Sequence, residues 1–345
     1  MISSIEITRF RGIREGKLED LAPLTVLVGR NGCGKTSVLD ALLVAGSRNP
    51  GEAIGQTVAR HPGVEFGAPW LFWRRGYSGP AEVAMKTNYG TFVGDEIEQY
   101  ERTTKLRLLE APDEECRIEA KLLDNSDSKT LGGAAVDVAF SRGNKFSVAA
   151  EAPCLIPPEQ FPGARLMEGR RSSLDTPLHE LLSRARMHGL LREALHITQG
   201  VLPDAKELAI DVENGLPLVV LDYGDHAVPV ALCGDGVYSL VSLSLELAAH
   251  EKTTVLFEEP EVHQHPGAMR QTVRAILAAV RRDIQVVLTT HSLELIDVLL
   301  AESSDEDLER LALYRMELDD GRLISARMTG PEVAFSRFEI ENDLR

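Results

Sequence analysis

The octapeptide from Gly29 to Thr36, GRNGCGKT, constrains the fold more than any other segment of the chain. It matches the pattern GxxxxGK[ST] and lies between an apolar run, LTVLV, and a helical pattern expected from Thr36 to Ala45. Such a loop binds phosphate, because its glycines let backbone N–H groups turn inward and the helix N-terminus adds positive potential. A chance glycine-rich turn is disfavoured, since both flanking elements agree with the motif. We therefore predict an α/β protein that binds a nucleotide.

The residues of this loop are the candidate nucleotide ligands. We expect Lys35 to reach the outer phosphates and the hydroxyl of Thr36 to bind magnesium. ATP and Mg²⁺ are accordingly the predicted cofactors. The predicted contacts to ATP come from Gly29, Arg30, Asn31, Gly32, Cys33, Gly34, Lys35, Thr36 and Ser37.

A second segment supplies carboxylates. The run VLFEEPE, from Val255 to Glu261, has the pattern of a buried strand that ends in acidic residues. We expect Glu258 to hold Mg²⁺ through water, and Glu259 to orient or deprotonate the hydrolytic water as a general base. The alternative is a surface acidic cluster after a core strand, which the phosphate loop upstream makes less favoured.

His291 follows the apolar strand QVVL and a pair of threonines. This places an imidazole at the carboxyl end of a buried strand, where open α/β sheets bind ligands. We predict a γ-phosphate sensor and catalytic residue, although a lone histidine in such a place is more often structural. His263 and His265 could suggest a metal pair, but no cysteine or third ligand has zinc-like spacing, so a structural or dimer-loop role is preferred.

The remaining patterns outline the architecture. Period-two alternation between 81 and 150 predicts an antiparallel sheet layer, whereas 47–80, rich in Gly and Pro, is predicted to be loop. A helix is expected from 177 to about 199 after a Thr176 cap, and a hairpin at Asn214-Gly215. Further expected elements are a buried helix over YSLVSLSLELAAH, an amphipathic helix over 268–282, and, after His291, one helix, an acidic stretch and a small hairpin.

Composition limits the classes of partner. Lys and Arg number 37 against 53 Asp and Glu, a formal charge of -16 that opposes bulk binding to nucleic acid or an anionic membrane. No apolar run reaches the roughly 20 residues of a membrane span, and the N-terminus lacks a secretory signal. The four cysteines are far apart, which indicates no disulfide framework. We expect a soluble cytoplasmic protein with no membrane partner.

Contact with nucleic acid is therefore expected to be indirect, or confined to a local basic patch. The densest basic run comprises Arg165, Arg170, Arg171, Arg184, Arg186 and Arg192. Direct phosphate contacts would appear as an affinity that falls steeply with salt. We favour the alternative that these arginines form a solvated face paired with Glu168, Asp175, Glu180 and Glu193.

Four segments taken together resemble a known class of proteins. They are ISSIEITRFRGI at the N-terminus, GRNGCGKTSVLDAL, VLFEEPEVHQHP and VVLTTHS. In combination and order they resemble the ABC-type ATPase heads of the RecF/SMC class, most closely the ATPases of the OLD (overcoming lysogenization defect) group. The resemblance implies Walker A roles for Lys35 and Thr36, Walker B roles for Glu258 and Glu259, and the switch role for His291.

The resemblance also implies a signature loop that contacts a partner's γ-phosphate. The segment Gly234-Asp235-Gly236, in front of a predicted helix, has the expected place and a glycine-rich character, with an ordinary loop as the alternative. His265-Pro266 matches the family's loop after Walker B. Three departures stand out: Glu258 replaces the usual Asp, the Q-loop glutamine could be Gln56 or Gln99, and residues 292–345 are too few for the TOPRIM nuclease domain of OLD nucleases.

The fold expected from this resemblance is α/β, a P-loop NTPase of ABC-ATPase type. Its mixed central sheet carries an antiparallel β layer and an inserted helical subdomain. We expect a single ABC-type head over 1–345. Its parts are a nucleotide-binding lobe from 1–150 plus 250–325, a helical or signature subdomain at about 165–250, and a C-terminal hairpin tail at 310–345.

The resemblance implies a homodimer or higher oligomer that closes around ATP and hydrolyses it. Such heads couple hydrolysis to a DNA transaction or to control of a separately encoded effector, such as a nuclease, in bacterial anti-phage defence. Two alternatives stay open: a RecF-like DNA repair ATPase that binds DNA directly, and a nucleotide-dependent scaffold that hydrolyses ATP slowly or not at all.

Overall fold

The computed structural model describes residues 1–61, 63–76, 82–93, 96–110, 116–126, 129–151, 163–168, 176–262, 264–340 and 342–344. The chain divides into two compact units. Unit 1 comprises Met1–Ala22, Leu27–Leu166 and Tyr314–Arg327, and unit 2 comprises Pro23–Val26, Met167–Leu313 and Met328–Arg345. Four strands have residues in both units: β3 (Leu24–Val28), β9 (Ala164–Glu168), β15 (Leu311–Asp319) and β16 (Arg322–Thr329).

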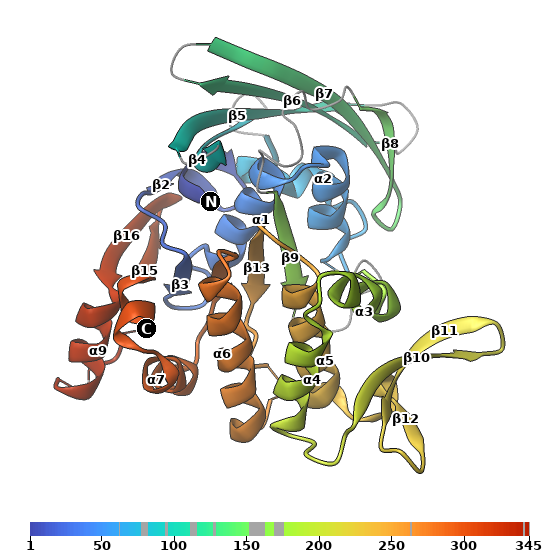
Figure 1. The fold of residues 1–345 in the computed structure, drawn as a ribbon. Helices are drawn as coiled ribbons and strands as arrows, with labels where there is room; N and C mark the ends of the chain where they lie inside the picture. The colour runs from blue at the N-terminus through green and yellow to red at the C-terminus, as the bar shows by residue number, and fades with distance from the viewer. Residues whose placement is uncertain are drawn as a thin grey trace. The chain divides into compact units, whose positions relative to one another are not determined.

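Unit 1 is built on a sheet whose strands follow the order β8-β7-β6-β5-β4-β1-β2-β16-β15 (Figure 1). Pairing from β8 to β2 is antiparallel, and a parallel bridge joins Arg322 of β16 to Glu15 of β2. The predicted antiparallel layer over 81–150 is therefore confirmed. Its strands, with those at the N-terminus, are β1 (Ile2–Phe10), β2 (Ile13–Leu18), β4 (Glu82–Val93), β5 (Glu96–Glu110), β6 (Cys116–Ser126), β7 (Lys129–Ser141) and β8 (Lys145–Glu151).

The inner face of this layer is apolar and packs against two helices. In β6, Ile118 and Ala120 are fully buried, whereas Arg117 before them and Lys121 after them are exposed, as period-two alternation requires. Helix α1 (Lys35–Gly46) contacts β1 and β4, and helix α2 (Pro50–Ala59) contacts β7 and β8. Burial of these apolar faces is the main stabilising term for unit 1.

Helix α2 corrects the prediction that 47–80 is loop. Pro50 occupies its first turn, and its two glycines are sites of close packing. A Cβ on Gly55 would lie 2.2 Å from the Phe146 ring, and one on Gly51 would lie 2.7 Å from Val136. These glycines let the helix approach the sheet. A short 3₁₀ turn follows, η1 (Ala68–Leu71), and then η2 (Trp73–Gly76), in which Arg74 and Arg75 have left-handed φ of 48° and 56°.

Unit 2 contains a parallel strand pair and a group of helices. Strands β13 (Thr254–Glu258) and β14 (Gln285–Thr289) pair so that Glu258 is level with Thr289. The long helices are α5 (Asp235–Ala248), α6 (Pro266–Arg281) and α7 (Leu293–Glu302). Their bounds agree with the buried and amphipathic helices that the sequence predicts.

The first helices of unit 2 correct a second prediction. The helix expected over 177–199 is broken into α3 (Leu178–Met187) and α4 (Leu191–Gln199). Gly189, with φ 73°, ends the first helix in the left-handed conformation. The predicted Thr176 cap is wrong, because Pro177 is the N-cap of α3.

A small antiparallel sheet shares a hydrophobic core with α3, α4 and α5. Its strands are β10 (Glu207–Glu213), β11 (Leu216–Asp222) and β12 (Ala227–Pro229), followed by the turn η3 (Val230–Leu232). The predicted hairpin at Asn214-Gly215 is confirmed, with φ 51° and 80° at its two turn residues.

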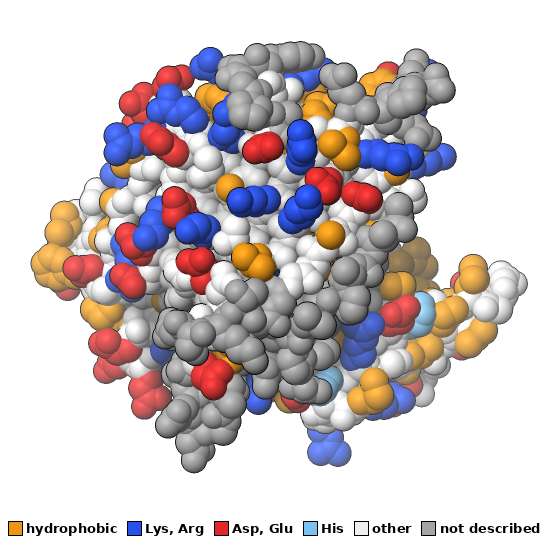
Figure 2. Space-filling model, turned by 90° about the horizontal axis from the view of Figure 1, so that it is seen from above, with side chains coloured by type: hydrophobic (Ala, Val, Ile, Leu, Met, Phe, Trp, Pro, Cys, Tyr) orange, Lys and Arg blue, Asp and Glu red, His pale blue; other side chains and the backbone are white. Residues whose placement is uncertain are grey.

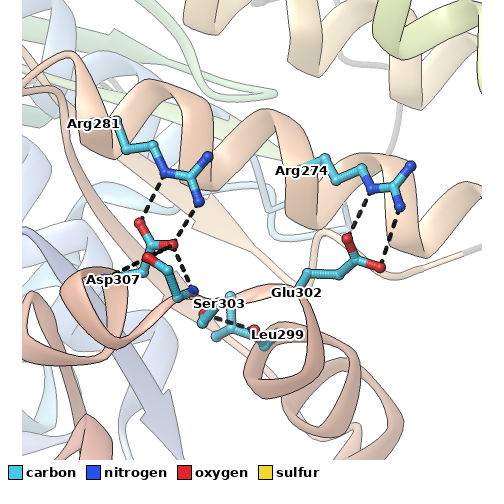
Figure 3. A network of polar contacts seen from close by, with 7 residues as sticks. Arg274, Arg281, Leu299, Glu302, Ser303 and Asp307 are labelled. Carbon is cyan, nitrogen blue, oxygen red and sulfur yellow. Dashed lines mark hydrogen bonds and ion pairs between the residues drawn. The ribbon is translucent and has the colours of Figure 1, made fainter.

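Ion pairs tie α6 to the helices that follow β14 (Figure 3). The Arg281 guanidinium donates to both oxygens of Asp307, at 2.9 and 2.6 Å, and Arg274 donates to both oxygens of Glu302, at 2.8 and 3.4 Å. The hydrogen bonds from Arg281 hold the pKa of Asp307 at about 2. The predicted acidic stretch forms a short helix, α8 (Asp305–Glu309). A further helix that was not predicted, α9 (Gly330–Phe338), follows the C-terminal hairpin.

Charges of both signs lie on the face that Figure 2 views from above. Lys121 pairs with Glu119 at 3.0 Å, and Arg107 lies 4.0 Å from Glu82. Blue and red side chains are intermixed across the described part of this face. Within the described part of the chain, no helix has the length and apolar character needed to cross a membrane.

Candidate functional site

The predicted phosphate loop lies in unit 1 between β3 and α1. β3 is buried throughout, and Gly34 at the N-cap of α1 has φ 95°. Gly29 has φ 142°, and a Cβ there would lie 2.4 Å from the backbone oxygen of Met316. Only glycine meets both requirements at Gly29. The first bond within α1 runs from the Val38 amide to the Gly34 oxygen at 2.9 Å, so the N-terminus of the helix opens onto the loop.

Lys35 is folded over the loop that precedes it. Its ammonium Nζ donates to the carbonyl oxygens of Gly29, at 2.9 Å, and Arg30, at 3.2 Å, and lies 3.7 Å from Cys33 Sγ. The side chain is buried, whereas Arg30, Asn31 and Gly32 are exposed. The carbonyl groups of Gly29 and Arg30 thus hold the Lys35 ammonium group, which would meet an outer phosphate, at the loop.

A buried ion cluster that the sequence did not reveal anchors α1. Asp40 is fully buried on this helix, and its carboxylate contacts Arg11 Nε at 2.8 Å and Arg60 Nη1 at 3.1 Å. Burial raises the pKa of Asp40, but the charges of Arg11 and Arg60 and the His61 imidazole, 3.8 Å away, outweigh it and hold the pKa below its usual range. A charge buried with its partners fixes the helix relative to the β1–β2 turn and the end of α2.

The predicted carboxylates and histidine lie together in unit 2. Glu258 ends β13 and Glu259 follows it, with a left-handed φ of 47° that is strained for a non-glycine residue. The Glu259 amide donates to the backbone oxygen of Thr289 at 3.1 Å and faces its hydroxyl at 3.3 Å. The turn after β13 is therefore tied to the end of β14.

Glu259 and His291 are brought into contact. His291 Nε2 lies 3.4 Å from Glu259 Oε1, with 34% and 38% of the two side chains exposed. An imidazole and a carboxylate at this distance form an ion pair when the imidazole is protonated. Both groups stay accessible to solvent and to a ligand.

Two further residues join this group, although sequence reasoning gave them no role. The Thr290 hydroxyl donates to Glu261 Oε1 at 2.5 Å and accepts the Ser292 amide at 2.9 Å. Burial, with a smaller effect from the Glu259 charge, raises the pKa of Glu261. The only signal available beforehand was the third carboxylate in EEPE and a second threonine after the strand.

His265 has a structural role that the structure makes visible. Its Nδ1 accepts the Gly267 amide at 3.3 Å and so caps α6, with Pro266 in the first turn. This agrees with the structural alternative for the histidine pair. His263 lies outside the described residues.

The predicted signature segment begins α5. Gly234 is the N-cap with φ 88°, and Gly234 and Asp235 are exposed. Among the described residues, no heavy atom lies within 4 Å of the position that a Cβ on Gly234 would take. Leu232, just before it, is 76% exposed. Gln56 donates to Glu52 within α2 at 3.3 Å and Gln99 is exposed on β5, so neither is singled out as the Q-loop residue.

Several arginines of the basic run have acidic neighbours. Arg184 lies 3.5 Å from Glu180, and Arg186 lies 3.8 Å from Glu207. Glu193 instead pairs with Arg282. Arg170, Arg171 and Asp175 lie outside the described residues.

The residues present fit the predicted cofactors. Thr36 in unit 1 offers a hydroxyl and Glu258 in unit 2 offers a carboxylate. Each is a hard oxygen donor of the kind that Mg²⁺ prefers, and each side chain is half-buried. At Gly32, which has φ 78°, a Cβ would meet no described atom within 4 Å, and this exposed part of the loop leaves room for a phosphate group. The loop and the carboxylate–histidine group are each formed within one unit.

The sequence matches a family model and is similar to several known proteins. Residues 1–65 and 179–296, together more than half of the chain, match the family model described as AAA ATPase domain. The chain is 21% identical to an ATP/GTP phosphatase of Helicobacter pylori over the full length of both. It is also 34% identical to the uncharacterized protein MJECL11 of Methanocaldococcus jannaschii over 113 residues, which cover 32% of this chain and 98% of that one.

A solved structure shows the same fold. The crystal structure of an SMC head bound to the C-winged helix domain of ScpA is similar with a TM-score of 0.52 at 12% identity, and the alignment covers 95% of this chain and 97% of that chain. This similarity confirms the predicted fold class, a P-loop NTPase of ABC-ATPase type.

Proposed function

The chain belongs to the AAA ATPase domain family and is an ATPase, and from this we propose that it hydrolyses ATP as a dimer closed around the nucleotide and thereby controls a separate effector protein. The finer assignment, to the OLD-like branch of these ATPases and to anti-phage defence or DNA processing, rests on the four sequence segments and the order in which they occur.

Each predicted site residue has a task in this proposal. The loop from Gly29 to Ser37 binds the phosphates, and Lys35 leaves its carbonyl partners for the outer phosphate oxygens, which offer full negative charge. Thr36, and Glu258 through water, would hold Mg²⁺, which would neutralise charge on the phosphates. Glu259 orients the attacking water and accepts its proton, and His291 senses the γ-phosphate.

One observation carries the hydrolytic part of the proposal: His291 Nε2 lies 3.4 Å from Glu259 Oε1. A carboxylate oriented by an imidazole at one oxygen can accept a proton at the other, as a general base must. The strained backbone of Glu259 supports a functional role for it, because strain of this kind clusters at active sites.

Two observations support the dimer and the partner. The exposed glycine-rich start of α5 is a surface that a second copy could bring to a γ-phosphate. The SMC head of similar fold was solved bound to a separate protein, the C-winged helix domain of ScpA, which supports control of a separately encoded partner here. The intermixed charges on the antiparallel layer give no support to direct DNA binding.

We also propose the domain division expected from the sequence: a nucleotide-binding lobe from 1–150 plus 250–325, and a signature subdomain at about 165–250. The hydrophobic core shared by α3, α4, α5 and the small sheet supports the second of these.

Light scattering of the Glu259→Gln variant, with and without Mg-ATP, tests the proposal. The variant keeps the phosphate loop and lacks the base, so ATP should double its mass, while Lys35→Ala should stay unchanged in mass. Wild type should release phosphate in a parallel assay. A Glu259→Gln protein that binds ATP and keeps its mass would refute the dimer, and one that hydrolyses ATP at the wild-type rate would refute the assignment of the base.

A further inference from the structure

Glu261 and Thr290 connect the turn after β13 to the segment that carries His291. The Thr290 hydroxyl donates to Glu261 Oε1 at 2.5 Å, and Thr290 is fully buried. This contact joins residues that are 29 positions apart in the chain. The Glu259 amide also donates to the backbone oxygen and the hydroxyl of Thr289, so the same two segments are joined at a second point.

The connection holds His291 from both sides. Thr290 precedes His291 and its hydroxyl accepts the amide of Ser292, the residue that follows. The Ser292 hydroxyl in turn accepts the Leu295 amide at 3.1 Å and caps α7. The backbone of His291 is thereby spanned by a side-chain hydrogen bond and fixed to a helix N-terminus.

Glu261 is held equally closely to Glu259. The Val262 amide donates to the Glu259 oxygen at 3.0 Å, and the Gln264 amide donates to the Glu261 oxygen at 3.0 Å, which forms two overlapping turns. Any displacement of Thr290 relative to Glu261 must therefore change the separation of the His291 imidazole and the Glu259 carboxylate.

The burial of the Glu261 carboxylate has a cost in stability, and this cost indicates a functional role. Glu261 Oε2 is buried and has no hydrogen-bond partner among the described residues. An unsatisfied buried polar atom typically costs about 1–3 kcal/mol, so burying this oxygen lowers the stability of the fold. Unsatisfied groups of this kind persist where a site requires them.

We propose that Glu261 is a positioning residue for ATP hydrolysis, acting through Thr290 to fix His291 against Glu259. The inference rests on the proposed function of Glu259 and His291. It adds Glu261 and Thr290 as residues that position them. Glu261 touches neither nucleotide nor water in this role, so its removal should lower kcat and leave the KM for ATP nearly unchanged.

The test uses the full chain and compares two matched Thr→Val variants. Thr290→Val removes the hydroxyl that bonds Glu261. Thr254→Val removes the hydroxyl that donates to Gln285 at 2.9 Å, a buried contact between the same two strands at their opposite ends. Thr290→Val also removes the acceptor of the Ser292 amide, so we expect its melting temperature to fall at least as far as that of Thr254→Val. Only Thr290→Val should lower kcat, by about tenfold or more, because small misplacements of reacting groups are costly.

Rescue and coupling complete the experiment. Thr290→Ser keeps the hydroxyl and should retain kcat within about twofold, as should Glu261→Gln, whose amide oxygen can still accept the bond. Glu261→Ala should lose as much activity as Thr290→Val and reports the same contact should the valine variant fail to fold. The double variant should be no worse than the worse single one, because the two residues act as one unit.

Each contrary result is informative. If Thr290→Val and Thr254→Val have equal kcat, or if the effects of Glu261→Ala and Thr290→Val add, the positioning role is wrong. Glu259→Gln in the same assay separates the two ideas. Its full activity would overturn the proposed function itself, whereas its inactivity beside an unaffected Thr290→Val would overturn only the role of Glu261.

Discussion

The imidazole of His291 and the carboxylate of Glu259 lie 3.4 Å apart because the two strands before them are parallel and in register. Glu258 is level with Thr289, so the first residues beyond each strand emerge at the same edge. Strand pairing within unit 2 therefore brings together two side chains that are distant in the chain.

Replacing Glu259 by Gln should lower the rate of phosphate release by about 10²–10⁴-fold, the usual contribution of a general base. ATP binding should persist, because the phosphate loop lies elsewhere in the sequence. A coupled phosphate-release assay and a nucleotide titration measure the two effects. The matched control is Glu251→Gln, which alters another carboxylate beside a histidine, 3.0 Å from His188, and should leave the rate unchanged.

Replacing Lys35 by Ala should weaken ATP binding by roughly 100-fold, the loss expected when a charged hydrogen bond to phosphate is removed. Titration with a fluorescent ATP analogue measures this. Lys17→Ala, which removes an exposed lysine paired with Glu19 at 2.6 Å, should bind ATP as wild type does. Wild-type affinity in the Lys35→Ala protein would mean that the nucleotide does not use this loop.

The phosphate loop and its flanking elements could be predicted because their signal is local. Gly29 and Gly34 adopt positive φ, and the apolar run before them can only be a buried strand. The positions of Glu259 and His291 after buried strands were also predicted, and the parallel register of β13 and β14 then brings the two side chains into contact.

Other features depend on tertiary contacts, which produce no recognisable pattern in the local sequence. Gly51 and Gly55 indicate loop by composition, yet they allow α2 to approach β7 and β8 closely. Gly189 ends α3 in the middle of a periodic apolar pattern. The bond from Thr290 to Glu261 joins two ends of strands and is visible only once their register is known.

Two glycines of the phosphate loop should differ in their tolerance of alanine. Gly32→Ala places a Cβ in open space at φ 78° and should cost about 1–2 kcal/mol of stability from backbone strain alone. Gly29→Ala adds a clash 2.4 Å from the Met316 oxygen and 2.8 Å from Cys33 Sγ, so its cost should exceed about 3 kcal/mol. Urea unfolding of the two variants measures the difference. Equal destabilisation would mean that β15 does not approach the loop so closely.

The last prediction concerns pH and the pair of Arg281 with Asp307. Hydrogen bonds from Arg281 lower the pKa of Asp307 from 3.8 to about 2 in the folded protein. The folded state thus binds fewer protons than the unfolded state between these values. The stabilisation is present in full above about pH 4 and is lost as the pH falls toward 2. Its size is roughly 1–2 kcal/mol, since the Arg281 side chain is half exposed.

Asp307→Asn isolates this contribution, because the amide oxygen can still accept the Ser304 amide bond of the capping box while the charge is lost. Urea unfolding at pH 6 should show the variant less stable than wild type, and the difference should shrink as the pH falls from about 4 to about 2. Asp305→Asn, an exposed change in the same short helix, should cost less than about 0.5 kcal/mol through the helix dipole. A difference between Asp307→Asn and wild type that stays constant down to pH 2.5 would show that the Asp307 charge does not stabilise the fold.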